Sequence, residues 1–195
     1  MVIGICGKIA SGKTEVMKIF VEKGFFPVYA DKIVHNLYKR GGKCAKKIVS
    51  VFGKEFLKRD GSVDRIKLRD VVFADNRKLK ILNHIVHPVV YFEITKILKR
   101  VIKCKQKIAI ESAYFEKDFA KDFVDKIIWV ERSKKKIIDV LVKKRGFSRK
   151  MADSVFELID KPANVDFILK NYGSLVELSE AGSIFSSRMS LSIVS

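Results

Sequence analysis

Residues 7–14 read GKIASGKT, a stretch whose residue types and spacing suit the binding of a phosphate chain. Two glycines five residues apart let a backbone turn sharply and bring its N–H groups close to phosphate oxygens. The lysine after the second glycine supplies a positive charge, and the hydroxyl residue after it can bind Mg²⁺. We therefore expect Lys13 to bridge the β- and γ-phosphates of a nucleotide, and Thr14 to bind Mg²⁺.

The residues around this loop support a nucleotide site. An apolar run at 2–6 precedes the loop, and a helical pattern at 14–23, ended by Gly24, follows it. A strand, a loop and a helix in this order direct a helix N-terminus at phosphate oxygens. The G-x-G-x-x-G pattern of dinucleotide-binding proteins does not fit these residues, and the sequence has no N-K-x-D tetrad, which counts against a GTPase.

Two carboxylates follow other apolar runs and are candidates for chemistry. Asp31 comes at the end of the run at 26–30, where it could orient an acceptor hydroxyl and take its proton. It could equally be the N-cap of the next helix, and spacing alone leaves the two alternatives open. Glu111 ends a third run, where it could hold Mg²⁺ through water or serve a structural role.

An arginine closes a helical pattern that runs from Ser133 to Gly146. The apolar positions of this pattern share one face, and Arg145 falls on the same face one turn later. We predict that Arg145 points inward and closes over the transferring phosphate. The alternative is a basic residue that only complements the dipole at the C-terminus of the helix.

The composition limits the class of protein. The chain has 195 residues, of which 48% are hydrophobic and 32% charged, as expected for one globular domain or a domain with an inserted lobe. Its net charge of +18 indicates an acidic partner such as a polyphosphate or nucleic acid, or else a lysine-rich solvated surface. The basic residues are dispersed and the aromatic residues are mostly Phe at core-like spacing, which speaks against a nucleic-acid partner.

The sequence offers no candidate membrane segment. The longest stretch without Asp, Glu, Lys or Arg, Ile81 to Phe92, is shorter than the ~18 residues that a span needs. The first residues read as a strand and not as a signal peptide, so we expect a cytoplasmic protein, which we take to be a monomer. Three well-separated cysteines, Cys6, Cys44 and Cys104, suit reduced core residues better than disulfides or a zinc site.

Short apolar runs that alternate with helical patterns predict an α/β fold. We expect a five-stranded, mainly parallel sheet of buried strands flanked by helices, the core of a P-loop NTPase. Between residues 32 and 106 only helical patterns occur, with Asp75 as a cap and Pro88 as the start of a new helix. The expected strands lie at 2–6, 26–30, 107–112, 126–131 and 165–170, and a serine-rich segment begins at Ala181.

The order of these motifs resembles the dephospho-coenzyme A kinase family. The resemblance covers the chain to about residue 180. Its most specific part is the spacing of the segments DRIKLRDVVF and LNHIVHP. It implies transfer of the γ-phosphate of ATP to the 3′-hydroxyl of dephospho-coenzyme A, the last step of coenzyme A synthesis. The motifs are IGICGKIASGKT, YADKIVH, DGSVDRIKLRDVVFAD, LNHIVHP, FE at 115–116, KKRGFS and VDFILKNYG.

The resemblance also implies an organisation within a single kinase domain and a role for each matching residue. Asp31 takes the place of the aspartate beside the acceptor hydroxyl, Arg65 and His87 match acceptor-binding residues, and Arg145 matches the lid arginine. Asn171 falls near the adenine side of the ATP pocket. The ATP-binding loop comprises Gly7, Lys8, Ile9, Ala10, Ser11, Gly12, Lys13, Thr14 and Glu15. The parts are a nucleotide-binding core (1–31, 107–132 and 165–195), a helical acceptor lobe (32–106) and a helical lid (133–164).

The chain departs from the family pattern at several positions. Tyr29 stands where the family has the first Asp of Asp-Ala-Asp, and His35 stands where it has an arginine. The usual Pro-Leu-Leu before FE is Ser112-Ala113-Tyr114, and the glutamine of the second lid helix is missing. These changes leave the phosphate-binding residues intact and fall on the acceptor site and the lid.

Overall fold

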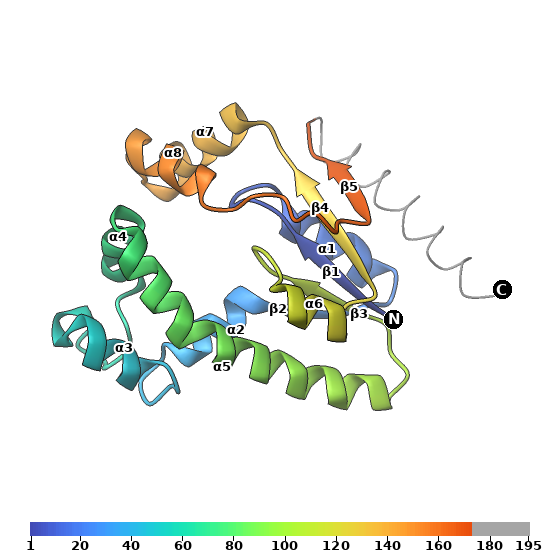
Figure 1. The fold of residues 1–195 in the computed structure, drawn as a ribbon, viewed down its shortest axis with the longest axis horizontal. Helices are drawn as coiled ribbons and strands as arrows, with labels where there is room; N and C mark the ends of the chain where they lie inside the picture. The colour runs from blue at the N-terminus through green and yellow to red at the C-terminus, as the bar shows by residue number, and fades with distance from the viewer. Residues whose placement is uncertain (173–195) are drawn as a thin grey trace. The chain divides into compact units, whose positions relative to one another are not determined.

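The computed structural model describes residues 1–172 and contains a five-stranded parallel sheet (Figure 1). The strand order is β2-β3-β1-β4-β5, and every neighbouring pair is parallel. The predicted strands are thus confirmed, within two residues at each end. Their bounds are β1 Val2–Cys6, β2 Phe26–Tyr29, β3 Ile108–Glu111, β4 Lys126–Glu131 and β5 Phe167–Lys170.

The helix α1, Lys13–Glu22, packs against one face of the sheet. Its buried residues Val16, Met17 and Phe20 form one cluster with Ile3 and Ile5 of β1. Gly4, between Ile3 and Ile5, faces the opposite side of the sheet, because side chains alternate along a strand. A Cβ at Gly4 would lie 2.7 Å from the ring of Phe115, so this glycine lets the chain ahead of α6 (Lys117–Phe123) pack close to the sheet.

The two outer strands are less buried than the sequence suggested. β2 and β5 each bury only one of their four residues, Val28 and Leu169 respectively. All five residues of β1 are buried. An apolar run predicts a strand from its residue types, whereas its burial depends on whether it lies at the centre or the edge of the sheet.

The chain divides into two compact units. One comprises Met1–Tyr29 and the chain from Leu98 onward, and the other is Ala30–Ile97. The second unit contains an isolated antiparallel bridge between Leu57 and Val63 and is otherwise helical. Its elements are α2 (Ala30–Leu37), α3 (Ala45–Phe52), the 3₁₀ helix η1 (Lys54–Phe56), α4 (Arg65–Ala74) and α5 (Asn76–Lys103), of which α5 continues into the first unit.

The helix α5 runs without a break through Pro88, so the prediction that a new helix starts there is wrong. Proline removes one helical hydrogen bond and costs about 3 kcal/mol. Beyond it, Val90, Ile94 and Leu98 are buried at helical spacing, and each contributes about 1.5–3 kcal/mol. Continuing the helix therefore stabilises more than the proline costs. The predicted cap is confirmed: the Asp75 carboxylate accepts a hydrogen bond from the N–H of Arg77 at 2.9 Å.

Helices α7, Lys134–Arg145, and α8, Arg149–Glu157, form a hairpin that turns at Gly146. Gly146 has a φ of 68°, a left-handed conformation that glycine adopts at little cost. The next residue, Phe147, is buried, and its N–H donates to the carbonyl of Leu141. Phe147 thus covers the end of the apolar face of α7. Arg145 is exposed and does not point inward, which corrects our prediction of its direction.

The cysteines differ in their surroundings. Cys6 and Cys44 are buried as expected, but Cys104 is exposed at the end of α5, which corrects its assignment to the core. Burial raises the pKa of the Cys6 thiol to about 12, although the charge of Lys13 acts in the opposite direction. The thiol next to the glycine-rich loop therefore stays protonated at neutral pH and serves only in packing.

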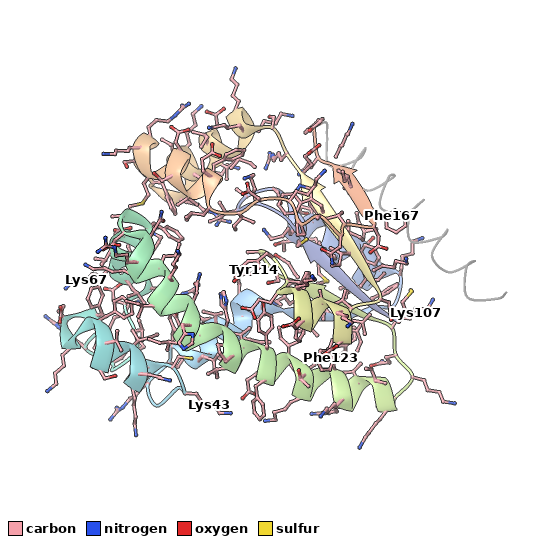
Figure 2. The ribbon with its side chains drawn as sticks, viewed as in Figure 1. Lys43, Lys67, Lys107, Tyr114, Phe123 and Phe167 are labelled. Atoms are coloured by element: carbon pink, nitrogen blue, oxygen red, sulfur yellow. The ribbon has the colours of Figure 1, made fainter. Side chains whose placement is uncertain are left out.

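Lysine side chains extend from well-separated parts of the chain, as Figure 2 shows for Lys43, Lys67 and Lys107. Lys43 pairs with Glu93 at 2.5 Å, and Lys67 donates to the carbonyl of Glu55 at 3.0 Å. Much of the positive charge is thus spread over separate local contacts. Within residues 1–172, none of the helices combines the length and the apolar character that a membrane span requires. The end of the predicted core range, and the serine-rich segment from Ala181, lie outside the described residues.

Candidate active site

The glycine-rich loop joins the end of β1 to the start of α1, as predicted. Gly7 and Gly12 have φ angles of 153° and 101°, which side chains rarely adopt. Both are also close to other atoms: a Cβ would lie 2.5 Å from the carbonyl oxygen of Val130 at Gly7, and 2.3 Å from the amide nitrogen of Asn171 at Gly12. Only glycine fits at either position.

Lys13 is the first residue of α1, and its side chain folds back over the loop. Its ammonium donates to the carbonyls of Gly7 and Lys8, at 3.0 Å each. The positive charge is therefore held at the loop, beside a helix N-terminus that itself favours anions. Of the other predicted loop residues, Glu15 pairs with Lys18 at 2.8 Å, so its carboxylate is engaged on the exposed side of α1.

Thr14 and Glu111 are brought together by the sheet. Glu111 ends β3 and lies in register with Ile5 of β1 and Tyr29 of β2. The Thr14 hydroxyl donates to the Glu111 carboxylate at 3.0 Å. A hydroxyl and a carboxylate at this distance are the hard oxygen ligands that suit Mg²⁺, which completes its shell with water and phosphate oxygens. Residues 1–172 contain no group of three or more His, Cys, Asp or Glu side chains that could hold a metal ion.

The pKa of the Tyr29 hydroxyl, beside Glu111, is raised. Partial burial is the largest cause, and the negative charge of Glu111 adds to it, while Lys18 opposes both. Tyr29 therefore stays neutral near pH 7 and does not replace the charge of the aspartate that the family pattern has at this position.

Two residues that follow strands hold the backbone of the loop. The Asn171 side chain is buried and donates to the Ser11 carbonyl at 2.7 Å. Arg132, just after β4, donates to the Ala10 carbonyl at 3.0 Å. Asn171 was expected beside adenine, and the structure describes it against the loop. Arg132 was missed, although its place at the carboxyl end of a parallel strand was a signal that could have identified it.

A cavity of about 300 Å³ lies beside the loop, between the end of β4 and the α7–α8 hairpin. Its wall combines apolar side chains with several cations and a single carboxylate, that of Glu131. The volume is at the lower end of the range for small-molecule pockets. The lining includes Lys8, Trp129, Arg132, Lys134, Phe156 and Tyr172.

The predicted acceptor residues belong to the unit Ala30–Ile97. Asp31 is exposed and is the second residue of α2, so it follows the helix start and is not the N-cap that spacing allowed. His35 lies one turn further along the same face. The guanidinium of Arg65 donates to Nδ1 of His35 at 3.1 Å, which requires a His35 ring with no hydrogen on that nitrogen. Asp31, His35 and Arg65 thus form a polar face of this unit, which we call the α2 polar face.

Arg65 is itself placed by a cap. It is the first residue of α4, and the preceding Asp64 accepts hydrogen bonds from the N–H groups of Ile66 and Lys67, both at 3.1 Å. The Asp64 cap thus fixes where α4 begins, and with it the position of Arg65. His87 lies within α5, partly buried, with its ring centroid 6.1 Å from that of Tyr91 in an edge-to-face arrangement.

Comparisons with known proteins agree with the motif order. The model of the dephospho-CoA kinase family matches residues 1–177. The dephospho-CoA kinase of Aquifex aeolicus is 34% identical over 183 residues, which are 90% of each chain. That of Carboxydothermus hydrogenoformans is 33% identical over 92% of this chain and 89% of its own. The chain belongs to the dephospho-CoA kinase family. It is accordingly a kinase, and ATP is its phosphate donor.

Solved structures share the fold of this family member. A Thermus thermophilus protein aligns with a TM-score of 0.70 at 23% identity, over 100% of this chain and 98% of its own. The dephospho-CoA kinase of Campylobacter jejuni aligns with a TM-score of 0.61 at 24% identity, over 96% of each chain. A gluconokinase of Sinorhizobium meliloti has a TM-score of 0.58 at 11% identity, over 98% of this chain and 94% of its own. The fold by itself therefore does not select the acceptor.

Proposed function

We propose that this member of the family transfers the γ-phosphoryl group of ATP to the 3′-hydroxyl of dephospho-coenzyme A, with coenzyme A and ADP as products. The observation that carries the proposal is the family match over residues 1–177, which includes the glycine-rich loop, the α2 polar face and the α7–α8 hairpin. Phosphoryl transfer depends on positioning and charge stabilisation, and the residues of the loop are suited to both.

The nucleotide is assigned to the glycine-rich loop. The N-terminus of α1 faces the phosphates in this assignment, and the Lys13 ammonium moves from loop carbonyls to the β- and γ-phosphates. Lys13 then neutralises charge that builds up as the phosphoryl group is transferred. Arg145, exposed at the end of α7, adds a second positive charge when the hairpin closes.

Magnesium is assigned to Thr14 and Glu111, whose oxygens already meet at 3.0 Å. When bound, the ion would reduce the negative charge of the phosphates. Thr14 would bind through its hydroxyl, and Glu111 would hold a metal-bound water through its carboxylate. Two protein oxygens are enough, because Mg²⁺ in kinases keeps several ligands from water and substrate phosphates.

Asp31 is assigned to the acceptor hydroxyl. It follows Tyr29, the last residue of β2, by only two residues, and two residues of chain span at most ~7 Å. The covalent connection therefore keeps Asp31 near the carboxyl end of β2, and Tyr29 is in register with Glu111 there. From this position the carboxylate can orient the hydroxyl toward phosphorus and take its proton late in the transfer.

The remaining acceptor contacts are assigned to Arg65 and His87. Arg65 offers the planar donors that suit phosphate groups of the acceptor, and His35 orients its guanidinium through Nδ1. We retain the predicted division into a nucleotide-binding core, an acceptor lobe at 32–106 and a lid at 133–164. A monomer in the cytoplasm is the setting that we propose for this activity.

A panel of acceptors tests the proposal. ADP release is measured with Mg-ATP and dephospho-coenzyme A, AMP, dTMP, adenosine, gluconate or shikimate, each over a range of concentrations. We expect turnover on dephospho-coenzyme A alone. Strong turnover on AMP or dTMP would instead identify a nucleotide kinase of the same architecture. RNA or DNA binding that weakens steeply with salt, with no ADP release on any acceptor, would favour a nucleic-acid-binding protein.

A further inference from the structure

Lys8, the second residue of the glycine-rich loop, directs its side chain away from the loop. Its ammonium donates to the carbonyl of Phe156 at 2.6 Å and to that of Ile159 at 2.5 Å. Phe156 lies in the last turn of α8, and Ile159 follows the helix by two residues. The last carbonyls of a helix lack partners within the helix, and they form the negative end of its dipole. A lysine ammonium is well suited to both features.

The ring of Phe156 provides a third contact. The Lys8 ammonium lies 4.2 Å from the ring centroid, within the range of a cation–π interaction. Lys134 lies 5.0 Å from the same centroid and also pairs with Glu157 at 2.7 Å. Lys134 is the first residue of α7, so its contacts stay within the hairpin. Lys8 is different, because its contacts join the loop to residues about 150 positions later in the chain.

The side chains of Lys8 and Lys13 thus extend to different partners. Lys13 folds over the loop toward the carbonyls of residues 7 and 8, where it can reach phosphate. Lys8 extends toward α8 and lines the cavity between β4 and the hairpin. The α7 helix has a separate contact with the core, because Lys136 donates to the carbonyl of Tyr172. The Lys8 contacts are therefore a second link between the core and the hairpin, at the end of α8.

We propose that Lys8 is a positioning residue that couples the glycine-rich loop to the α7–α8 hairpin. The inference rests on the proposed function, in which the loop binds the phosphates and the hairpin closes over them. Binding of the phosphates fixes the backbone of the loop and therefore the position of Lys8. Lys8 in turn holds the end of α8 through the carbonyls of Phe156 and Ile159 and the ring of Phe156. The hairpin is then held in the position from which Arg145 acts, and water is excluded from the phosphates.

Three variants test the coupling. Lys8→Met keeps the apolar stem beside Phe156 and removes the ammonium, so it should preserve packing and lose the coupling. Lys8→Arg keeps a donor cation and should restore most of it. Lys23→Met is the matched control, because Lys23 is an exposed lysine at the end of α1, away from the hairpin. Circular dichroism establishes that each variant is folded.

The kinetic readout separates kcat from nucleotide affinity. In Lys8→Met we expect kcat on dephospho-coenzyme A to fall on the order of tenfold to a hundredfold, the scale for misplaced catalytic groups. The Kd for ATP, followed by the fluorescence of Trp129 in the cavity wall, should change by less than about threefold, because the phosphate-binding atoms are untouched. ATP hydrolysis without acceptor should rise, since the hairpin no longer excludes water.

Hydrogen exchange provides a readout that needs no acceptor. In the wild-type protein and in Lys23→Met, Mg-ATP should slow exchange both in the loop and in residues 149–157. In Lys8→Met it should still protect the loop but no longer α8, and Lys8→Arg should recover the protection of α8. This pattern would support the coupling even if the wild-type protein did not phosphorylate dephospho-coenzyme A, so the two proposals can fail separately.

Two results would overturn the inference. If ATP protects α8 equally in Lys8→Met and in the wild-type protein, the loop and the hairpin are not coupled through Lys8. If the Kd for ATP rises as much as kcat falls, Lys8 is a phosphate ligand and not a positioning residue.

Discussion

The glycine-rich loop and the α2 polar face place their side chains by different means. The loop is held by residues that follow β4 and β5, because Arg132 and Asn171 donate to its carbonyls. Asp31 and Arg65 on the α2 polar face are exposed, and the hydrogen bond to His35 is the side-chain contact that the structure describes there. One site is anchored across the sheet, whereas the described side-chain hydrogen bond of the other joins two helices.

This difference indicates that the glycine-rich loop is more preorganised than the α2 polar face. A buried hydrogen bond such as that of Asn171 is strengthened by its low-dielectric surroundings, and removing one partner leaves a buried polar atom unsatisfied. Exposed polar contacts such as that of Arg65 contribute little to stability. We therefore expect substitution of a residue that braces the loop, such as Asn171, to lower stability. Substitutions on the α2 polar face should change acceptor use and leave the fold intact.

The largest effect is expected at the loop itself. Lys13→Ala removes the charge held at the loop and should lower kcat by roughly 10³-fold or more, the scale for removing a cation that stabilises a transferring phosphoryl group. Circular dichroism should be unchanged, because Lys13 is only partly buried. Lys18→Ala, one turn along α1 from Thr14, is the control and should stay active. Activity of Lys13→Ala within tenfold of wild type would exclude the loop as the phosphate site.

The next effect concerns the α2 polar face. Asp31→Asn keeps the shape of the side chain but removes its charge and basicity, so kcat should fall by roughly 10²-fold or more. The Kd for ATP and the melting temperature should barely change, since Asp31 is exposed. Steady-state kinetics and thermal unfolding measure both. A kcat within threefold of wild type would remove Asp31 from the catalytic site.

Asn171 tests whether the loop is braced in the absence of nucleotide. Asn171→Asp removes the donor to the Ser11 carbonyl and should lower the free energy of unfolding by about 1–3 kcal/mol in urea without ATP. Asn164→Asp, an exposed position before β5, should change it by less than half a kcal/mol, about the usual range for surface substitutions. If Asn171→Asp alters only ATP affinity, Asn171 serves adenine and does not brace the loop.

The smallest effect is expected at the cap that places Arg65. Asp64→Ala removes two hydrogen bonds to the N-terminus of α4 and should cost about 1 kcal/mol of stability. It should also raise the KM for dephospho-coenzyme A and leave that for ATP unchanged, because Arg65 begins the same helix. Asp64→Asn retains the cap and should resemble wild type in both measurements. Equal increases in both KM values would mean that the α2 polar face is not specific for the acceptor.

Much of the glycine-rich loop could be predicted, because its motif consists of neighbouring residues. The glycines at 7 and 12, the lysine and the threonine are defined by spacing, and their φ angles and close contacts follow from the same short turn. Strand positions also followed from residue type, as with β1 and β4, whose bounds match the prediction. The exposure of β2 and β5 did not follow, because burial depends on sheet order.

The sequence by itself determined the phosphate-binding loop, the alternation of strands and helices, and the family. Only the tertiary structure decided which side chains hold the loop and which helices continue. Lys8, Arg132 and Asn171 reach partners more than 100 residues away, a relation that no local period records. Pro88 stays within α5 because burial on both sides outweighs a local preference. Spacing is a property of neighbouring residues, whereas these contacts exist only after the chain has folded, when the loop meets the residues after β4 and β5 and the end of α8.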